Sequence, residues 1–154
     1  MIEKKFSITP DDITKQVKAK AYYTSRSRGE TSAMESTISD ILDSENSYFI
    51  TGSLATAIGS VQSAIGVFAP CSVINNKFTI KVPDHFDDSA TDSLAANATQ
   101  YCEAKVLYDW FAATSPADTS VYAQLMTQAL AEIQSNMRRR VHPSLMSDAS
   151  TSDT

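Results

Sequence analysis

Apolar residues recur every three or four positions along most of this chain, which is the spacing of one face of an α-helix. The longest such run predicts a helix over about residues 45–68, with an apolar stripe of Ile50, Leu54, Ile58, Val61, Ile65 and Phe68. Similar stripes predict helices over about residues 88–114, at the centre of the core, and over about 116–139. Two further helices are expected, one starting at Thr9-Pro10 and a short one over residues 33–42.

The pattern changes to strict alternation of polar and apolar residues over residues 77–82, which is typical of a strand. Asn75-Asn76 precedes this run and tolerates the left-handed backbone of a tight turn. A weaker alternation over residues 2–8 favours a short edge strand. The chain is therefore predicted to be mainly α, a compact bundle of four to five helices with one β-hairpin inserted at about residues 71–82.

Length and composition fit one folded domain. The chain has 154 residues, 42% of them hydrophobic, which is enough apolar material for a core. We expect a single domain over residues 1–143 and a flexible tail over residues 144–154, where no periodic pattern remains.

The formal charge of −5 is unevenly distributed along the chain. Residues 1–29 carry seven basic and three acidic side chains (+4), residues 30–137 three basic and thirteen acidic (−10), and residues 138–154 three basic and two acidic (+1). An acidic body argues against a nucleic-acid reader, because phosphate contacts need clustered Lys and Arg. The basic ends either meet acidic partners or are solvated.

One long stretch, residues 46–76, contains no charged residue. Within it, the 22 residues 48–69 are long enough to cross a bilayer, but six of them are Ser, Thr or Gln and three are Gly. The one-sided pattern favours a buried or interface helix over a transmembrane helix, and membrane association is kept as a weaker alternative.

The sequence predicts no catalytic, cofactor-binding or metal site. Asp84, His85, Asp87 and Asp88 resemble a divalent-metal cluster, but acids just before a helix are ordinary capping residues. No nucleophile elbow, Walker loop or dinucleotide fingerprint is present, so an enzyme is not expected. Cys71 and Cys102, which lie in no metal-ligand spacing, are expected to act as small buried hydrophobes.

The uncharged helix carries a second face of small residues: Gly52, Ser53, Thr56, Gly59, Ser60 and Ser63. Solvent-facing helices normally carry charge, whereas protein interfaces are depleted in it. Two interpretations remain open, an interface between subunits and packing inside the monomer against residues 88–114. At the other end of the bundle, Arg138, Arg139 and Arg140 either anchor an acidic partner or are helix-end cations in solvent.

Residues 78–143 resemble a known layout, with a strand FTIKVPDHF, a long helix containing YCEAKVLYDWFAATSP and a second helix containing YAQLMTQALAEIQSNMRRRVHP. The most specific pieces are Asp109-Trp110-Phe111, Ser115-Pro116, Tyr122 and the three arginines. This layout resembles the head–tail connector (adaptor) proteins of tailed phages, in the form encoded by phages and prophages of Bacteroidetes.

The resemblance implies a structural virion protein that acts by assembly and not by catalysis. Connectors form a homo-oligomeric ring, commonly twelve-fold, that docks on the portal protein, meets tail or further neck proteins, and lets DNA pass non-specifically. An acidic body suits such a channel, because like charge opposes adhesion of phosphate. The expected location is the head–tail junction of the virion, assembled in the bacterial host cytoplasm, with no membrane.

By the same resemblance, two sets of residues are expected to make the contacts. The subunit interface is assigned to Gly52, Ser53, Thr56, Gly59, Ser60, Ser63, Phe78 and Ile80. Portal docking is assigned to Arg138, Arg139, Arg140 and His142, with the basic N-terminus as the other possibility. Alternative functions are another portal-proximal ring or tail-completion protein, and a non-viral intracellular helical protein-binding module.

Overall fold

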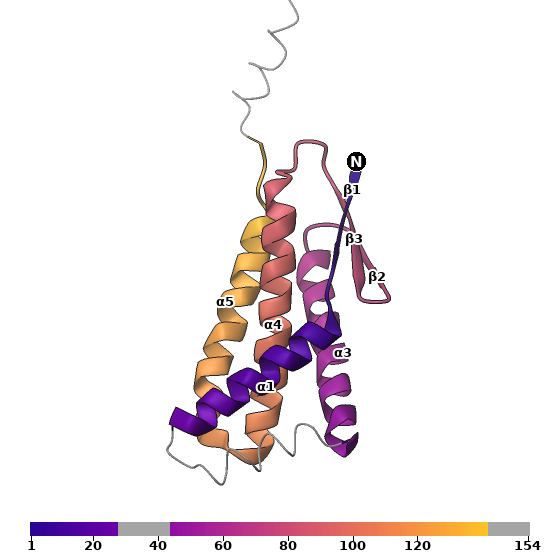
Figure 1. Ribbon diagram of the computed structural model, residues 1–154. Helices are drawn as coiled ribbons and strands as arrows, with labels where there is room; N and C mark the ends of the chain where they lie inside the picture. The colour runs from indigo at the N-terminus through magenta and orange to yellow at the C-terminus, as the bar shows by residue number, and fades with distance from the viewer. Residues whose placement is uncertain (28–43, 142–154) are drawn as a thin grey trace, which may run out of the picture.

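The computed structural model describes residues 1–27 and 44–141. Its elements follow in the order β1 (Ile2–Ser7), α1 (Pro10–Ser27), α3 (Ser44–Gly66), β2 (Cys71–Ile74), β3 (Lys77–Val82), α4 (Ser89–Thr114), the 3-10 turn η1 (Pro116–Asp118) and α5 (Thr119–Met137). The predicted fold class, a mainly helical bundle with a β-hairpin, is confirmed (Figure 1). The predicted helix over 33–42 and the predicted tail over 144–154 lie outside the described residues.

Helix α4 lies at the centre of the bundle and packs against α1, α3 and α5 (Figure 1). Its position follows from its sequence, because apolar residues four apart stack on one helix face. Leu94, Ala98, Cys102 and Val106 form such a stripe, and each is 0% exposed. Helix α1 begins at Pro10 with two acids in its first turn, as expected for a helix start, and crosses α4 on the near side in Figure 1.

The three strands form one antiparallel sheet in the order β1-β3-β2. The predicted hairpin is β2 and β3, joined by Asn75 and Asn76 with φ of 51° and 63°, the left-handed conformation expected of this turn. The weakly predicted N-terminal strand pairs with β3 along its whole length, from Ile2 opposite Val82 to Ser7 opposite Lys77.

The pairing of β1 makes β3 the central strand, and this corrects one expectation. Phe78 and Ile80 are both 0% exposed, because the apolar side of β3 covers the helices. Phe6 from β1 stacks on Phe78 with ring centroids 4.7 Å apart. These two predicted subunit-interface residues therefore belong to the core of the monomer and present no surface to a neighbour.

After α5 the chain turns back against the loop that precedes α4. The Val141 N–H donates to the His85 carbonyl at 2.9 Å, and Phe86 forms a single antiparallel bridge with Arg140. The amino group of Met1 contacts Asp84 of the same loop at 3.2 Å. The N-terminus, this loop and the last described residues consequently lie at one end of the bundle (Figure 1).

The burial of Phe78 can be tested by truncation. We expect Phe78→Ala to lower the free energy of unfolding by about 3–5 kcal/mol, because it leaves a cavity in the core. Val121→Ala, at a side chain that is 59% exposed, is the control and should change it by less than about 0.5 kcal/mol. Urea unfolding measures both, and an equally small loss for both variants would contradict the core position of β3.

Candidate interaction surfaces

The small-residue face predicted on α3 is mostly open. Gly52, Thr56, Gly59 and Ser63 are exposed and Ser60 is half-buried. A Cβ atom built on Gly52 or Gly59 would meet nothing within 4 Å, and the same holds for Gly66. Packing inside the monomer therefore does not explain these glycines, which leave room on the surface of the helix.

Two hydroxyl groups on this face are bonded within the helix itself. Thr56 Oγ1 donates to the Gly52 carbonyl at 3.1 Å, and Ser60 Oγ donates to the Thr56 carbonyl at 3.1 Å. A hydroxyl satisfied in this way needs no partner from outside the helix. The face, small and without charge, therefore allows another helix to approach without leaving the hydroxyls of Thr56 and Ser60 unpaired.

Ser53 differs from the other residues assigned to this face. It is 8% exposed, and its Oγ donates to Asp109 Oδ2 of α4 at 2.6 Å. Lys105 Nζ contacts the other carboxylate oxygen of Asp109 at 2.9 Å. Ser53 thus holds α3 against α4, and it is not a subunit-interface residue. Sequence reasoning missed this network, because it joins residues that lie 56 positions apart.

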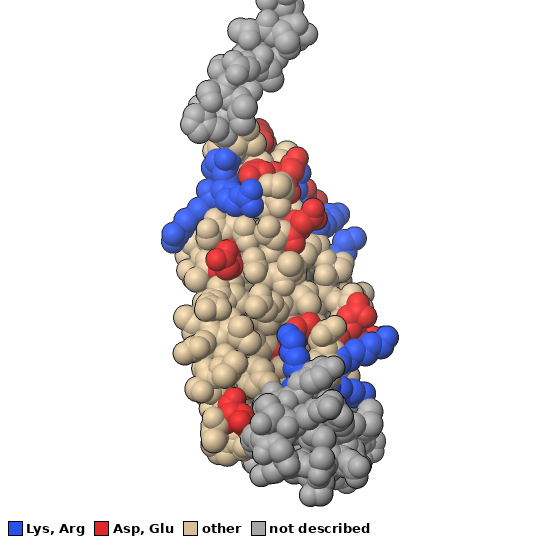
Figure 2. All heavy atoms as spheres, turned by 60° about the vertical axis from the view of Figure 1, so that its left-hand side comes forward, with Lys and Arg blue, Asp and Glu red and all other residues tan. Residues whose placement is uncertain are grey.

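A second helix face with almost no charge lies on α5. Glu132 is the only charged residue between Thr119 and Met137. The exposed positions are otherwise small or neutral: Ser120, Val121, Gln124, Thr127, Gln128, Ala131 and Ser135. Gln124 and Gln128 border a shallow depression. Figure 2 shows this side of the molecule, where a broad area without Lys, Arg, Asp or Glu separates charged groups nearer the two ends.

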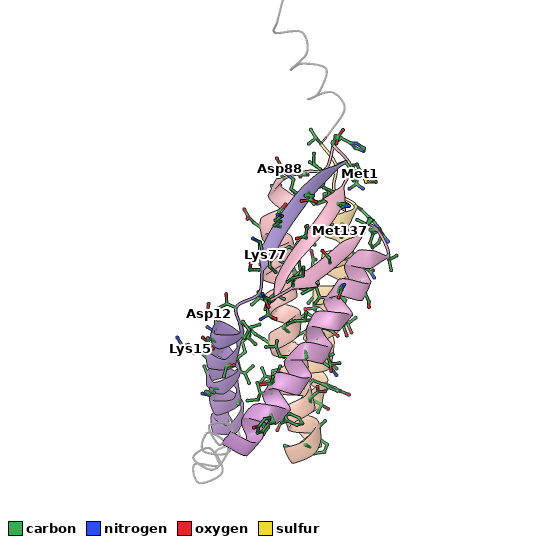
Figure 3. All side chains as sticks on the ribbon, turned by 90° about the vertical axis from the view of Figure 1, so that its right-hand side faces the viewer. Met1, Asp12, Lys15, Lys77, Asp88 and Met137 are labelled. Carbon is green, nitrogen blue, oxygen red and sulfur yellow. The ribbon has the colours of Figure 1, made fainter. Side chains whose placement is uncertain are left out.

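The faces of α3 and α5 point to different sides of the bundle. In Figure 1, α5 borders the left side and α3 the right side of α4, and Figures 2 and 3 look at these two sides in turn. Sequence periodicity had singled out the face on α3 but not the one on α5. The sequence nevertheless contains a signal for the face on α5, because a single charged residue among 19 is unusual for a helix with an exposed side.

The three arginines after α5 are in contact with the rest of the fold. The Arg138 guanidinium lies 5.0 Å from the centre of the Phe68 ring, and that of Arg140 lies 5.6 Å from the Phe86 ring. Arg139 Nη2 donates to Asp87 Oδ2 and to Ser89 Oγ, both at 2.7 Å. All three remain exposed. His142, the fourth residue assigned to docking, lies outside the described residues.

The acidic loop considered as a metal cluster is occupied by cations of the protein itself. Asp84 contacts the amino group of Met1, Asp87 contacts Arg139, and Asp88 contacts Lys4. Each carboxylate therefore faces a different positive group. Within the described residues, no group of three or more His, Cys, Asp and Glu side chains is arranged to hold a metal ion.

The two cysteines are free thiols in the folded protein. Burial raises the pKa of the Cys102 thiol to about 12, and the nearby charge of Glu103 adds to this effect. Burial also raises the pKa of the half-buried Cys71. Neither group is a thiolate at neutral pH, so neither has the form that acts as a nucleophile.

No protein-family model, no curated protein and no solved structure matches this chain. Across the described ranges 1–27 and 44–141, no helix is long and apolar enough to cross a membrane.

The two environments of serine on α3 predict different mutational effects. Ser53→Ala removes a hydrogen bond to a carboxylate, so we expect the free energy of unfolding to fall by about 1.5–3 kcal/mol. Ser63→Ala is the matched control on the exposed face and should change it by less than about 0.5 kcal/mol. Chemical denaturation measures both, and equal effects would contradict the assignment of Ser53 to the α3–α4 contact.

The contact of Asp87 with Arg139 predicts a pH dependence. Hydrogen bonds from the hydroxyl and the N–H of Ser89, together with the charge of Arg139, lower the pKa of Asp87. Its contribution to stability is therefore present above the ordinary value of 3.8 and is lost as the pH falls through the lowered pKa. Asp87→Asn should melt at a lower temperature than the wild type at pH 7, and the difference should vanish in acid. A difference independent of pH would contradict this account.

Proposed function

We propose that this chain is a structural virion protein of a tailed phage, a head–tail connector that forms a ring, docks on the portal and continues the DNA channel toward the tail. The observation that carries the proposal is the pair of helix faces with almost no charge, on α3 and α5, on different sides of one bundle. The resemblance of residues 78–143 to connectors supports the same function.

A ring needs two different surfaces on each subunit. A head-to-tail contact joins one patch of a subunit to another patch of its neighbour, and it closes when the rotation allows. In the proposed ring, the α3 face around Gly52 and Gly59 receives the longer side chains Gln124 and Gln128 from α5 of the next copy. The two glycines, seven residues apart, lie two turns apart on one side of α3, and Gln124 and Gln128, four residues apart, lie one turn apart on one side of α5.

The charged end of the bundle is proposed as the portal side. Arg138, Arg139 and Arg140 lie there with the N-terminus, so the N-terminal strand and the last described residues approach the same partner. Docking on acidic groups of a portal competes with the contacts that these arginines make to Asp87 and to the aromatic rings. The acidic charge of residues 30–137 suits the passage of DNA, since like charges repel.

Gly59→Leu tests the contact between subunits. The space around Gly59 is open, so the larger side chain leaves the monomer folded, and the helix gains about 1 kcal/mol of intrinsic propensity. The side chain should nevertheless block close approach of α5 and abolish ring formation on the portal. Sedimentation velocity and negative-stain imaging measure assembly, and a melting curve measures folding.

Ala19→Leu, at an exposed position of α1 outside both faces, is the matched control and should assemble normally. Rings of Gly59→Leu that form as readily as those of the wild type would remove the α3 face from the interface. A wild-type protein that stays monomeric in the presence of a portal would favour the helical binding module instead.

A further inference from the structure

The outer face of the sheet gathers lysines from two parts of the sequence. On β3, Lys77 and Lys81 point away from the core, since they alternate with the buried Phe78, Ile80 and Val82. The pairing of β1 places Lys5 opposite Thr79, between these two lysines on the same face. Along the sequence, Lys5 belongs to the basic N-terminal segment, whereas Lys77 and Lys81 belong to the acidic residues 30–137. The pairing of β1 with β3 brings the three lysines together.

The three lysines form a regular row. Residues rise by about 3.3 Å along a strand, so Lys77, Lys5 and Lys81 stand at levels about 6.6 Å apart. Hydroxyl groups of Ser7, Ser72 and Thr79 lie on the same face, according to the strand register. Figure 3 looks onto this side of the sheet, with Lys77 at its lower end, while Lys15 projects from α1 to the left.

The positive charge of this row is only partly balanced. Lys5 reaches Glu3 at 4.0 Å, at the limit of an ion pair, and Glu3 also lies opposite Lys81 in the strand register. Neither Lys77 nor Lys81 has an ion-pair partner among the described residues. Three cations therefore face solvent with a single carboxylate among them.

We propose that this face of the sheet binds the phosphodiester backbone of a nucleic acid without reading its bases. Lys and Ser are depleted in protein–protein interfaces, whereas Lys, Ser and Thr are common contacts to phosphate. None of the outward residues of the three strands is aromatic, so bases have no stacking platform. This site goes beyond the proposed ring and does not depend on it, because it lies outside the faces of α3 and α5.

Fluorescence anisotropy with a labelled 20-base-pair DNA duplex of mixed sequence tests the site. Three phosphate contacts predict a slope of log affinity against log salt of about −2.7, three times about −0.9. Lys77→Gln/Lys81→Gln should bind about tenfold more weakly at low salt, with a slope of about −0.9. Lys15→Gln/Lys18→Gln changes the net charge equally at positions off the sheet, and its affinity should change less than twofold.

Glu3→Gln provides a test in the opposite direction. Removal of this carboxylate should tighten binding several-fold, which a variant that merely disturbs the fold would not do, and circular dichroism verifies folding. If the Lys77/Lys81 and Lys15/Lys18 double variants lose the same amount of affinity for DNA, net charge and not the row of lysines causes binding, and the proposal is overturned. So would dependence on base sequence, or equal binding of poly-glutamate, which indicates an acidic protein partner. An RNA duplex of the same sequence shows whether the site prefers the phosphodiester backbone of DNA or of RNA. Tighter binding of DNA or of RNA supports the site in both cases.

Discussion

The antiparallel pairing of β1 with β3 determines where the N-terminal part of the chain lies. It joins residues 70 to 80 positions apart, and it places Phe6 on Phe78 and directs α1 across α4. Without β1, β3 would be an edge strand and Phe78 would lose its contact with the Phe6 ring. The same pairing turns Phe78 and Ile80 into core residues and collects Lys5, Lys77 and Lys81 on one outer face.

Two side-chain contacts join the sheet to the helices. On β2, the Cys71 carbonyl accepts a hydrogen bond from Gln62 Nε2 of α3 at 3.1 Å, which ties the hairpin to this helix. Lys4, on the inner side of β1, reaches Asp88 before α4. The sheet is thereby joined to both α3 and α4, while the outer faces of α3 and α5 are left free for other contacts.

Local periodicity was sufficient to predict the helices and the hairpin. The expected boundaries 45–68, 88–114 and 71–82 lie within two residues of Ser44–Gly66, Ser89–Thr114 and the strands from Cys71 to Val82. Periodicity shows which side of an element is apolar, but not which element covers it. The resemblance to connectors assigns Phe78 and Ile80 to a subunit interface, whereas in the structure β1 and the helices cover them. Ser53 and Ser63 are likewise indistinguishable in sequence, and only the position of Asp109 separates them.

The central claim is that two helix faces with almost no charge, on α3 and α5, join copies of this chain into a ring on a portal. It is tested most directly by co-sedimentation of the purified protein with the portal ring encoded in the same genome, followed by negative-stain imaging of the pellet. The account predicts a stoichiometric ring of added density at one end of the portal. Absence of binding, with the protein folded and the portal intact, would contradict it.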